Sequence, residues 1–301
     1  MIMIGQQLLN GLTIGSIYAL IALGYTMVYG VLKLINFAHG DLFAVGAFLG
    51  SSVILFGLSQ AGLPSLIVLV LTLLLIAFFV AVLGVMIERI AYRPVRSAGR
   101  LPALVSALGV SIVLQNGIML IWGARPRAFP SHILPEYKWN VFGILISWTQ
   151  LGILLLSFLL MISLYVFVQK TRTGAALRAI AVDQQTAQLM GIHVNKLIRL
   201  VFIIGPALGG IAGVMVGLYY GQIIFTMGWS YGLKAFTVAI LGGIGNIPGA
   251  MVGGLLLGVI ESLAAGYISG NWKEVISFIV LILILLVRPT GLLGERVAEK
   301  I

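Results

Sequence analysis

Long apolar segments recur along the whole chain and constrain its fold more than any other feature. Each holds roughly 18 residues or more, enough to cross a bilayer core of about 30 Å as a helix. Only 9% of the 301 residues are charged, against about 25% in soluble domains. We therefore predict an all-α polytopic membrane protein with a single transmembrane domain. The apolar segments are 8–32, 36–57, 64–87, 101–122, 146–169, 197–222, 232–265 and 271–288.

Basic residues gather in the connections between these segments and predict their orientation. Four arginines lie in 88–100, and five basic residues face one acid in 170–199. The tail adds Arg288, Arg296 and Lys300. By the positive-inside rule these regions are expected in the cytoplasm, with 123–145 and the N-terminus outside. The net charge of +10 is then explained by membrane orientation and not by nucleic-acid binding.

Segment 232–265 is too long for one span. As a single helix its 34 residues would extend about 51 Å. Its centre, 242–249, is a helix-breaking cluster of glycines with one proline. We predict two short helices or a re-entrant pair, giving eight or nine membrane segments with the C-terminus inside.

Four residues of this break are candidates to line a translocation pathway: Gly243, Gly245, Asn246 and Pro248. Non-helical backbone at membrane depth is tolerated where it lines a cavity or is buried in protein. The N-termini of broken helices also face anionic groups such as a carboxylate. The alternative is a tight cytoplasmic turn between two helices.

A second polar feature, at residues 36–41, opens a hydrophobic segment. Asn36, His39 and Asp41 lie there. They are further candidates for the pathway or its inner gate. The plainer alternative is an ordinary helix start capped by Asn36 or Asp41.

Two charges lie within neighbouring apolar segments. Lys234 and Glu261 are both placed toward the outer end in this topology. A partner lowers the cost of a charge in the membrane, so we expect the two to form a structural ion pair. The alternative is that Lys234 extends alone to the surface.

The connection at 172–192 is a moderately polar, alanine-rich helix former inside a basic loop. Its apolar residues recur at helical spacing, which predicts a short amphipathic helix. Such a helix could lie on the bilayer surface or dock into a partner protein.

The sequence carries no pattern for chemistry of its own. It has no Walker loop of the form GxxxxGK[ST]. It has no cysteine and no cluster of His, Asp and Glu at metal-ligand spacing. We expect neither a catalytic, a cofactor-binding nor a metal site, so the chain is not predicted to be an enzyme.

Six stretches in order along the chain identify a family. They are GLTIGSIYALIALGYTMVYG at 11–30, INFAHGD at 35–41, IERIAYRPVR at 87–96, TGAALRAIAVDQQTAQLMGI at 173–192, LKAFTVAILGGIGNIPGAMVGGLLLG at 233–258 and LVRPTGLLG at 286–294. With them the chain resembles, nearly end to end, the LivH-type permeases of branched-chain amino-acid ABC importers.

The resemblance implies a machine with several parts. Such permeases work with a second, related permease, two cytoplasmic ATPases and an extracytoplasmic substrate-binding protein in a bacterial cytoplasmic membrane. They dock the ATPase through a loop similar to E-A-A-x-x-x-G, expected here at about 170–196. Gln and Thr replace Glu and Ala in this copy. The coupling residues so implied are Arg178, Asp183, Gln185, Thr186, Ala187 and Gly191.

Two alternatives stay open at this point. Similar permeases carry urea, short amides or other neutral amino acids, so the machine could be the same with another cargo. A stand-alone secondary transporter is the second alternative. Against it, membrane segments hold few acids, mainly Asp41 and Glu261, whereas proton-coupled carriers usually have more.

Overall fold

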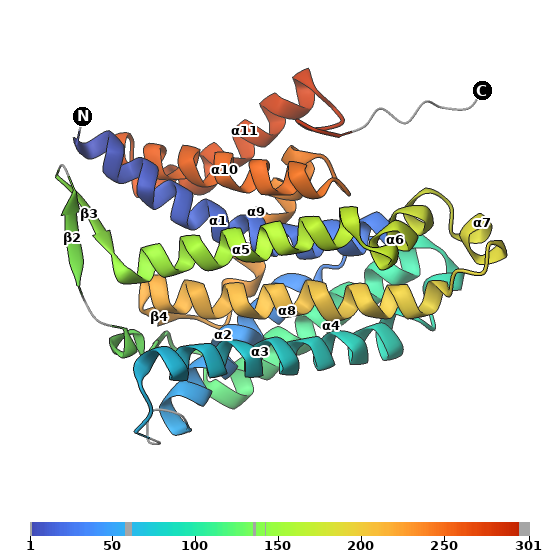
Figure 1. Cartoon of the computed structure of the whole chain (residues 1–301), viewed down its shortest axis with the longest axis horizontal. Coiled ribbons are helices and arrows are strands. Elements are labelled where there is room, and N and C mark those ends of the chain that lie inside the picture. The colour runs from blue at the N-terminus through green and yellow to red at the C-terminus, as the bar shows by residue number, and fades with distance from the viewer. Residues whose placement is uncertain (1, 58–61, 135–136, 142, 295–301) are drawn as a thin grey trace.

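The computed structural model describes residues 2–57, 62–134, 137–141 and 143–294; Arg296 and Lys300 lie outside them. Within these residues eight helical segments are long and apolar enough to cross a membrane, and they form one elongated bundle (Figure 1). A short 3-10 turn, Gly270–Trp272, extends the last, and a π-helical turn, Glu88–Tyr92, the third. The helices are α1 Ile2–Leu32, α2 Ala38–Phe56, α3 Ser65–Ile87, α4 Arg100–Trp122, α5 Trp148–Lys170, α8 Val194–Tyr220, α10 Ile247–Tyr267 and α11 Lys273–Val287.

Shorter elements mark the two ends of the bundle. The strands β2 Lys138–Val141 and β3 Ile144–Ser147 form an antiparallel pair at one end, called here the hairpin end (Figure 1). The helices α6 Arg172–Val182 and α7 Gln184–Leu189 lie at the other, called the α7 end. The remaining elements are α9 Met227–Gly242, two short 3-10 turns, Arg96–Ala98 and Ser131–Ile133, and the strands β1 Arg127–Ala128 and β4 Gln222–Ile223, which pair with each other.

Helix α1 runs between these ends through the centre of the bundle. Near its start, Gln6 Nε2 donates to the Leu145 carbonyl of β3 at 3.1 Å. Near its end, the Val31 carbonyl accepts from Gln184 Nε2 of α7 at 2.6 Å. Because α1 is contacted by α5, α8, α9 and α10, any force on α7 reaches a helix that touches most of the bundle.

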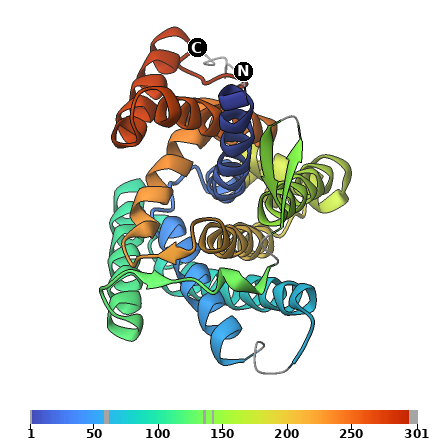
Figure 2. The same cartoon turned by 90° about the vertical axis from the view of Figure 1, so that its left-hand side faces the viewer.

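The crossing of α1 and α10 depends on glycine. A Cβ added to Gly15 would lie 2.7 Å from the Gly254 carbonyl oxygen, and one added to Gly258 would overlap the Gly15 backbone. Membrane helices have no hydrophobic drive to associate and pack through such small residues. Figure 2, which looks along the bundle, shows α1 surrounded by its neighbours.

The outer surface of the bundle is apolar. Large aliphatic side chains are exposed on α3, α4, α5 and α11, for example Leu66 at 68% and Leu120 at 81%. Water would not stabilise such a surface, so its solvent is lipid. This confirms the predicted all-α polytopic membrane fold.

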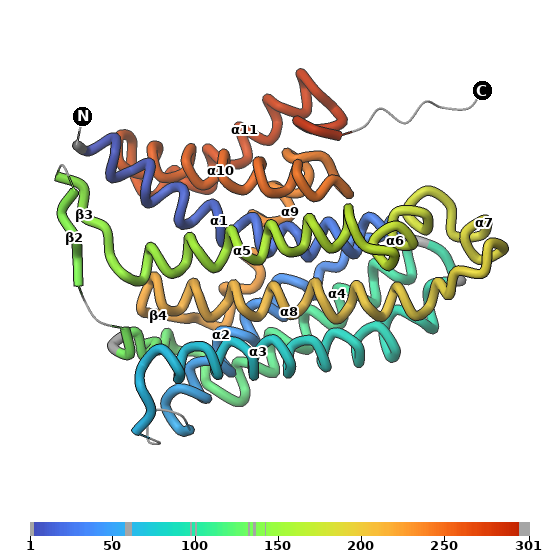
Figure 3. The backbone as a smooth tube through the Cα atoms, viewed as in Figure 1, coloured from blue at the N-terminus to red at the C-terminus, as the bar shows by residue number. Residues whose placement is uncertain are grey.

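Several sequence-based boundaries differ from the structure, and α1 begins at Ile2 and not at residue 8. The break in 232–265 is present, at 243–246, but α9 begins at Met227 and not at 232. Gly228, predicted in a loop, is buried in α9 against α2. The stretch 172–192 is not one helix, because the backbone of Asp183 is extended (φ −151°, ψ 116°) and separates α6 from α7. The backbone tube of Figure 3 shows the separation of α6 from α7.

Candidate functional site

The predicted coupling residues cluster at the α7 end. The Asp183 carboxylate accepts from the Gln185 N–H at 2.9 Å and from the Thr186 hydroxyl, so it caps α7. These bonds, that from Thr186 first, hold the pKa of Asp183 below its ordinary value, because they favour the ionised form. The carboxylate is therefore charged, and the cap formed, at neutral pH.

Arg178 and Ala187 attach these short helices to the bundle. The Arg178 guanidinium on α6 donates to the Val168 carbonyl of α5. Ala187 is buried on α7. Gly191, between α7 and α8, has φ +83°, a left-handed conformation with open space around it. The α6–α7 unit is thus held from α5 on one side and, through Gln184, from α1 on the other.

The tip of this unit carries apolar side chains in an otherwise polar loop. Val182, Leu189 and Met190 are 89%, 87% and 79% exposed. Beside them, a cavity of about 550 Å³ opens between α7, the start of α8 and Arg96. Arg96 donates to Asn195 Oδ1 at 2.7 Å, which links the α3–α4 connection to α8. Apolar residues so exposed, outside the lipid-facing helices, are typical of a protein-docking surface.

The polar residues at the start of α2 lie inside the bundle. His39 Nε2 is 3.1 Å from the Ile21 carbonyl oxygen of α1, and Asn36 Oδ1 accepts from the Tyr92 hydroxyl at 2.9 Å. The Ser111 hydroxyl of α4 donates to Asp41 Oδ2. No side chain caps α2, so the alternative of a helix start capped by Asn36 or Asp41 was wrong.

This group, called here the α2 polar cluster, consists of Asn36, His39 and Asp41, and each of its side chains has a polar atom without a hydrogen-bond partner among the described residues. All three residues are almost completely buried. Among the described residues, no partner bonds Asn36 Nδ2, His39 Nδ1 or Asp41 Oδ1. Unpaired buried polar atoms destabilise a fold and are therefore concentrated where function or bound water needs them. The cluster remains a candidate part of a polar pathway.

The break between α9 and α10 is a tight turn at the α7 end. Gly243 and Gly245 have φ +104° and +93°, and Gly245 faces Gly30, two residues before the end of α1. Asn246 caps α10 by accepting from the Gly249 N–H at 2.9 Å, and its Nδ2 donates to the Leu293 carbonyl at 2.7 Å. Pro248 is in the first turn of α10.

The structure does not bring the two groups of pathway candidates together. Gly228, which lies against Asp41, is the second residue of α9, and Gly243 follows the end of that helix. Fifteen residues of helix separate them by about 22 Å. The α2 polar cluster is inside the bundle, whereas the turn lies near its end, beside the segment that precedes the tail.

The two membrane charges lie together. Lys234 Nζ on α9 is 3.2 Å from Glu261 Oε1 on α10. The Tyr18 hydroxyl donates to Glu261 Oε2 at 2.8 Å, and the Ser277 hydroxyl of α11 donates to Oε1. Glu261 thus joins four helices in one network.

Several partners of these residues were missed from the sequence: Tyr18, Tyr92, Ser111 and Ser277. Tyr18, Ser111 and Ser277 lie within helical, mostly apolar stretches. Tyr92 instead ends the π-helical turn Glu88–Tyr92, in the basic connection 88–100. Their one signal is that an isolated polar group in a membrane helix usually faces the interior of the bundle. That signal does not identify the residue with which such a group pairs, because the pairing depends on how the helices cross.

Comparison with known proteins shows what this arrangement belongs to. A family described as branched-chain amino acid transport system, permease component, matches residues 7–285. The chain belongs to this family. The high-affinity branched-chain amino acid transport permease LivH of Salmonella typhimurium is 47% identical, with 98% of this chain and 97% of that protein covered.

Two further relatives show the breadth of the similarity. The corresponding permease BraD of Pseudomonas aeruginosa is 45% identical over 98% of this chain and 97% of its own length. The fructose import permease FruG of Bifidobacterium longum is 23% identical over 98% and 89%. The predicted LivH-type resemblance is confirmed, and this chain is far nearer to the branched-chain amino acid permeases than to FruG.

Proposed function

We propose that this chain is the membrane permease subunit of an ATP-driven importer for leucine, isoleucine and valine. Support comes from the matched family and from relatives at 45–47% identity over nearly the whole chain, whose names carry branched-chain amino acid transport. The observation that carries the ATP-driven part is the α7 end. It exposes Leu189 and Met190 on a unit tied to α1 and α5.

The proposed orientation follows from charge. The α7 end holds the basic connections 88–100 and 170–199, so it faces the cytoplasm of a bacterium by the positive-inside rule. The hairpin end and the N-terminus then face outward, and the C-terminus faces the cytoplasm. Residues 1–301 form a single permease domain, with its coupling loop at about 170–196.

The proposed partners are a second, related permease, two cytoplasmic ATPases and an extracytoplasmic binding protein. The ATPase receives the exposed apolar tip, Val182, Leu189 and Met190. ATP-driven movement of the ATPase displaces α6 and α7 together. Their attachments at Val168 and Val31 pass the displacement to α5 and α1, and so to the helices around the α2 polar cluster.

The proposed pathway passes the α2 polar cluster and the start of α9. A close crossing of glycines joins the two helices, because a Cβ on Gly228 would lie 2.6 Å from Asp41 Oδ1 and one on Gly40 would overlap the Gly228 backbone. Small residues let the backbones of the two helices approach this closely. The work is mechanical; ATP hydrolysis takes place in the separate ATPase subunits.

The docking role of the tip can be tested by making it charged. In the assembled transporter, Leu189→Asp with Met190→Asp should release the ATPase subunits during purification. Loss of an interface anchor costs about 2 kcal/mol or more, or roughly thirtyfold in affinity. Gln188→Ala, at an exposed polar position of the same helix, is the matched control. If the charged variant retains the ATPase subunits fully, the tip is not part of the interface with the ATPase.

A further inference from the structure

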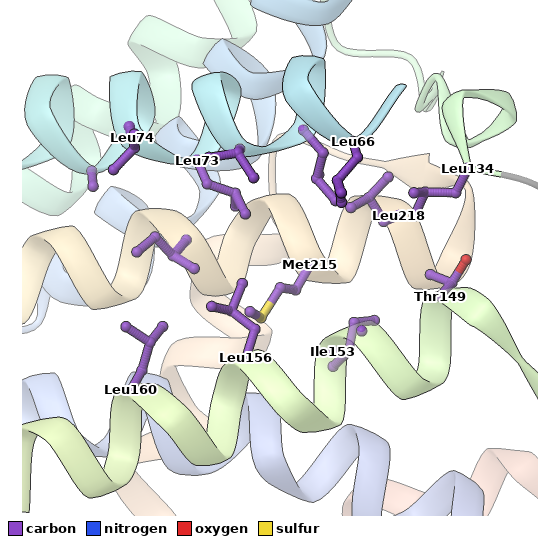
Figure 4. Close-up of a pocket in the computed structure, with 15 residues that line it drawn as sticks. Leu66, Leu73, Leu74, Leu134, Thr149, Ile153, Leu156, Leu160, Met215 and Leu218 are labelled. Carbon is purple, nitrogen blue, oxygen red and sulfur yellow. The ribbon is translucent and has the colours of Figure 1, made fainter. Parts of the chain in front are cut away.

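A groove of about 360 Å³ lies on the outside of the bundle between α3, α5 and α8. Figure 4 shows its walls: Leu66 and Leu73 from α3, Leu156 from α5, and Met215 from α8 point toward one another. Thr149 is the single polar side chain in the lining. An amino acid has no place here, because its ammonium and carboxylate would be buried without partners.

The groove extends over one half of the membrane thickness. Its lining runs from Leu66 to Ala77 on α3 and from Thr149 to Leu160 on α5. Eleven residues of helix rise about 17 Å, close to half of a hydrocarbon core of roughly 30 Å. Both helices continue for ten residues beyond the groove, to Ile87 and Lys170. A partner's membrane-spanning helix would need a contact surface along the full length, whereas a lipid chain ends at the middle.

The open end of the groove is at the level of the lipid head groups. Leu66 and Thr149 are the second residues of α3 and α5, at the hairpin end. Trp148 precedes Thr149, and its ring lies 4.7 Å from that of Trp139 in β2. Tryptophan pairs at helix ends typically mark the membrane interface. The Thr149 hydroxyl therefore gives the lining a polar group at the level of the head groups.

The groove is also continuous with the surface that faces lipid. Three leucines on its walls or beside them are 63–68% exposed: Leu66, Leu74 and Leu159. A lipid acyl chain that enters the groove from the bilayer therefore passes no polar side chain on this surface.

From this geometry we infer that the groove is a binding site for one acyl chain of a phospholipid from the outward-facing leaflet. The acyl chain lies along Leu73, Leu156 and Met215. The head group of the same lipid lies beside Thr149 and Trp148. The bound lipid fills the space between α3 and α5, which both pack on α8. The site differs from the general lipid surface because three helices enclose it.

Glycine gives a direct test of this site. Gly152 lines the groove, and a Cβ there meets no atom within 4 Å, so Gly152→Val and Gly152→Leu place their added side chains in the groove. Gly109 on α4 is also exposed with open space and lies outside the lining, so Gly109→Leu is the matched control. Glycine in a helix interior is destabilising because of its backbone freedom, so all three variants should fold.

The measurement is native mass spectrometry of the assembled transporter, purified from vesicles of phosphatidylethanolamine and phosphatidylglycerol. The unmodified chain and Gly109→Leu should retain one more phospholipid per copy than Gly152→Leu, with Gly152→Val between them. The expected loss of retention is about tenfold. Equal retention in all four forms would overturn the proposal. Cross-linking of the Leu156→Cys variant to the second permease would overturn it too, because a protein segment would then occupy the groove.

Discussion

Lys234 on α9 and Glu261 on α10 form an ion pair of 3.2 Å between the two helices, well away from the turn that joins them. Glu261 is buried, and it also accepts bonds from Tyr18 and Ser277. A lone carboxylate in this position would lie in a low-dielectric interior, where its desolvation is expensive. The pair therefore stabilises one geometry of α1, α9, α10 and α11.

Removing one member of this pair should cost more than removing both. Lys234→Met leaves Glu261 without its cation, and loss of one partner of a buried pair costs roughly 3–5 kcal/mol. Lys234→Met combined with Glu261→Gln keeps an acceptor for Tyr18 and should recover much of that loss. The readout is the thermal unfolding midpoint in detergent. Additive effects of the two substitutions would show that the contact carries no coupling energy.

A second prediction concerns the packing of α2 against α1. A Cβ at residue 24 would overlap the ring of His39, so Gly24→Ala should reduce the yield of folded protein and abolish transport. Overpacking of this kind typically costs about 1–3 kcal/mol. Gly24→Ala with His39→Ala should fold better, because the ring is gone. Size-exclusion profiles of the membrane extracts measure this, and a double variant as poor as Gly24→Ala would contradict it.

A third prediction concerns the cap of α7. The depressed pKa of Asp183 means that its cap is fully formed above the ordinary carboxyl range and is lost as pH falls through the lowered value. Asp183→Ala should therefore raise amide exchange in α7 at neutral pH and weaken ATPase coupling. Asp183→Asn should keep the cap and remove its acid sensitivity, since asparagine also accepts. Equal exchange in Asp183→Ala and the unmodified chain would exclude a cap that orders α7.

Part of this fold could be predicted from hydropathy alone. The long apolar segments could be located because lipid contact requires an uninterrupted apolar helix. The break near 243–246 could be predicted because glycine and proline end helices locally. Both signals are contained in consecutive residues.

The remaining features depend on tertiary packing. Residue 227 begins α9 because Gly228 can approach α2 closely, and the sequence pattern around it is that of a loop. Asp183 divides a sequence that favours helix throughout, because its side chain bonds the next turn. For the pathway candidates, hydropathy could not separate the interior position of Asp41 from the end position of Gly245, since depth depends on how the helices are tilted.

The central claim is that this chain imports branched-chain amino acids and that the transport is driven by ATP hydrolysis in a partner subunit. The direct measurement is uptake of labelled leucine by vesicles that contain this chain, the second permease, the ATPases and the binding protein. We predict uptake that requires ATP on the ATPase side and the binding protein on the other, and that is lost with Leu189→Asp and Met190→Asp. Uptake that continues without ATP and is driven by an ion gradient would contradict the account and identify a secondary transporter. If urea or another amino acid stimulates ATP hydrolysis and no leucine is taken up, the proposed cargo of branched-chain amino acids would be wrong.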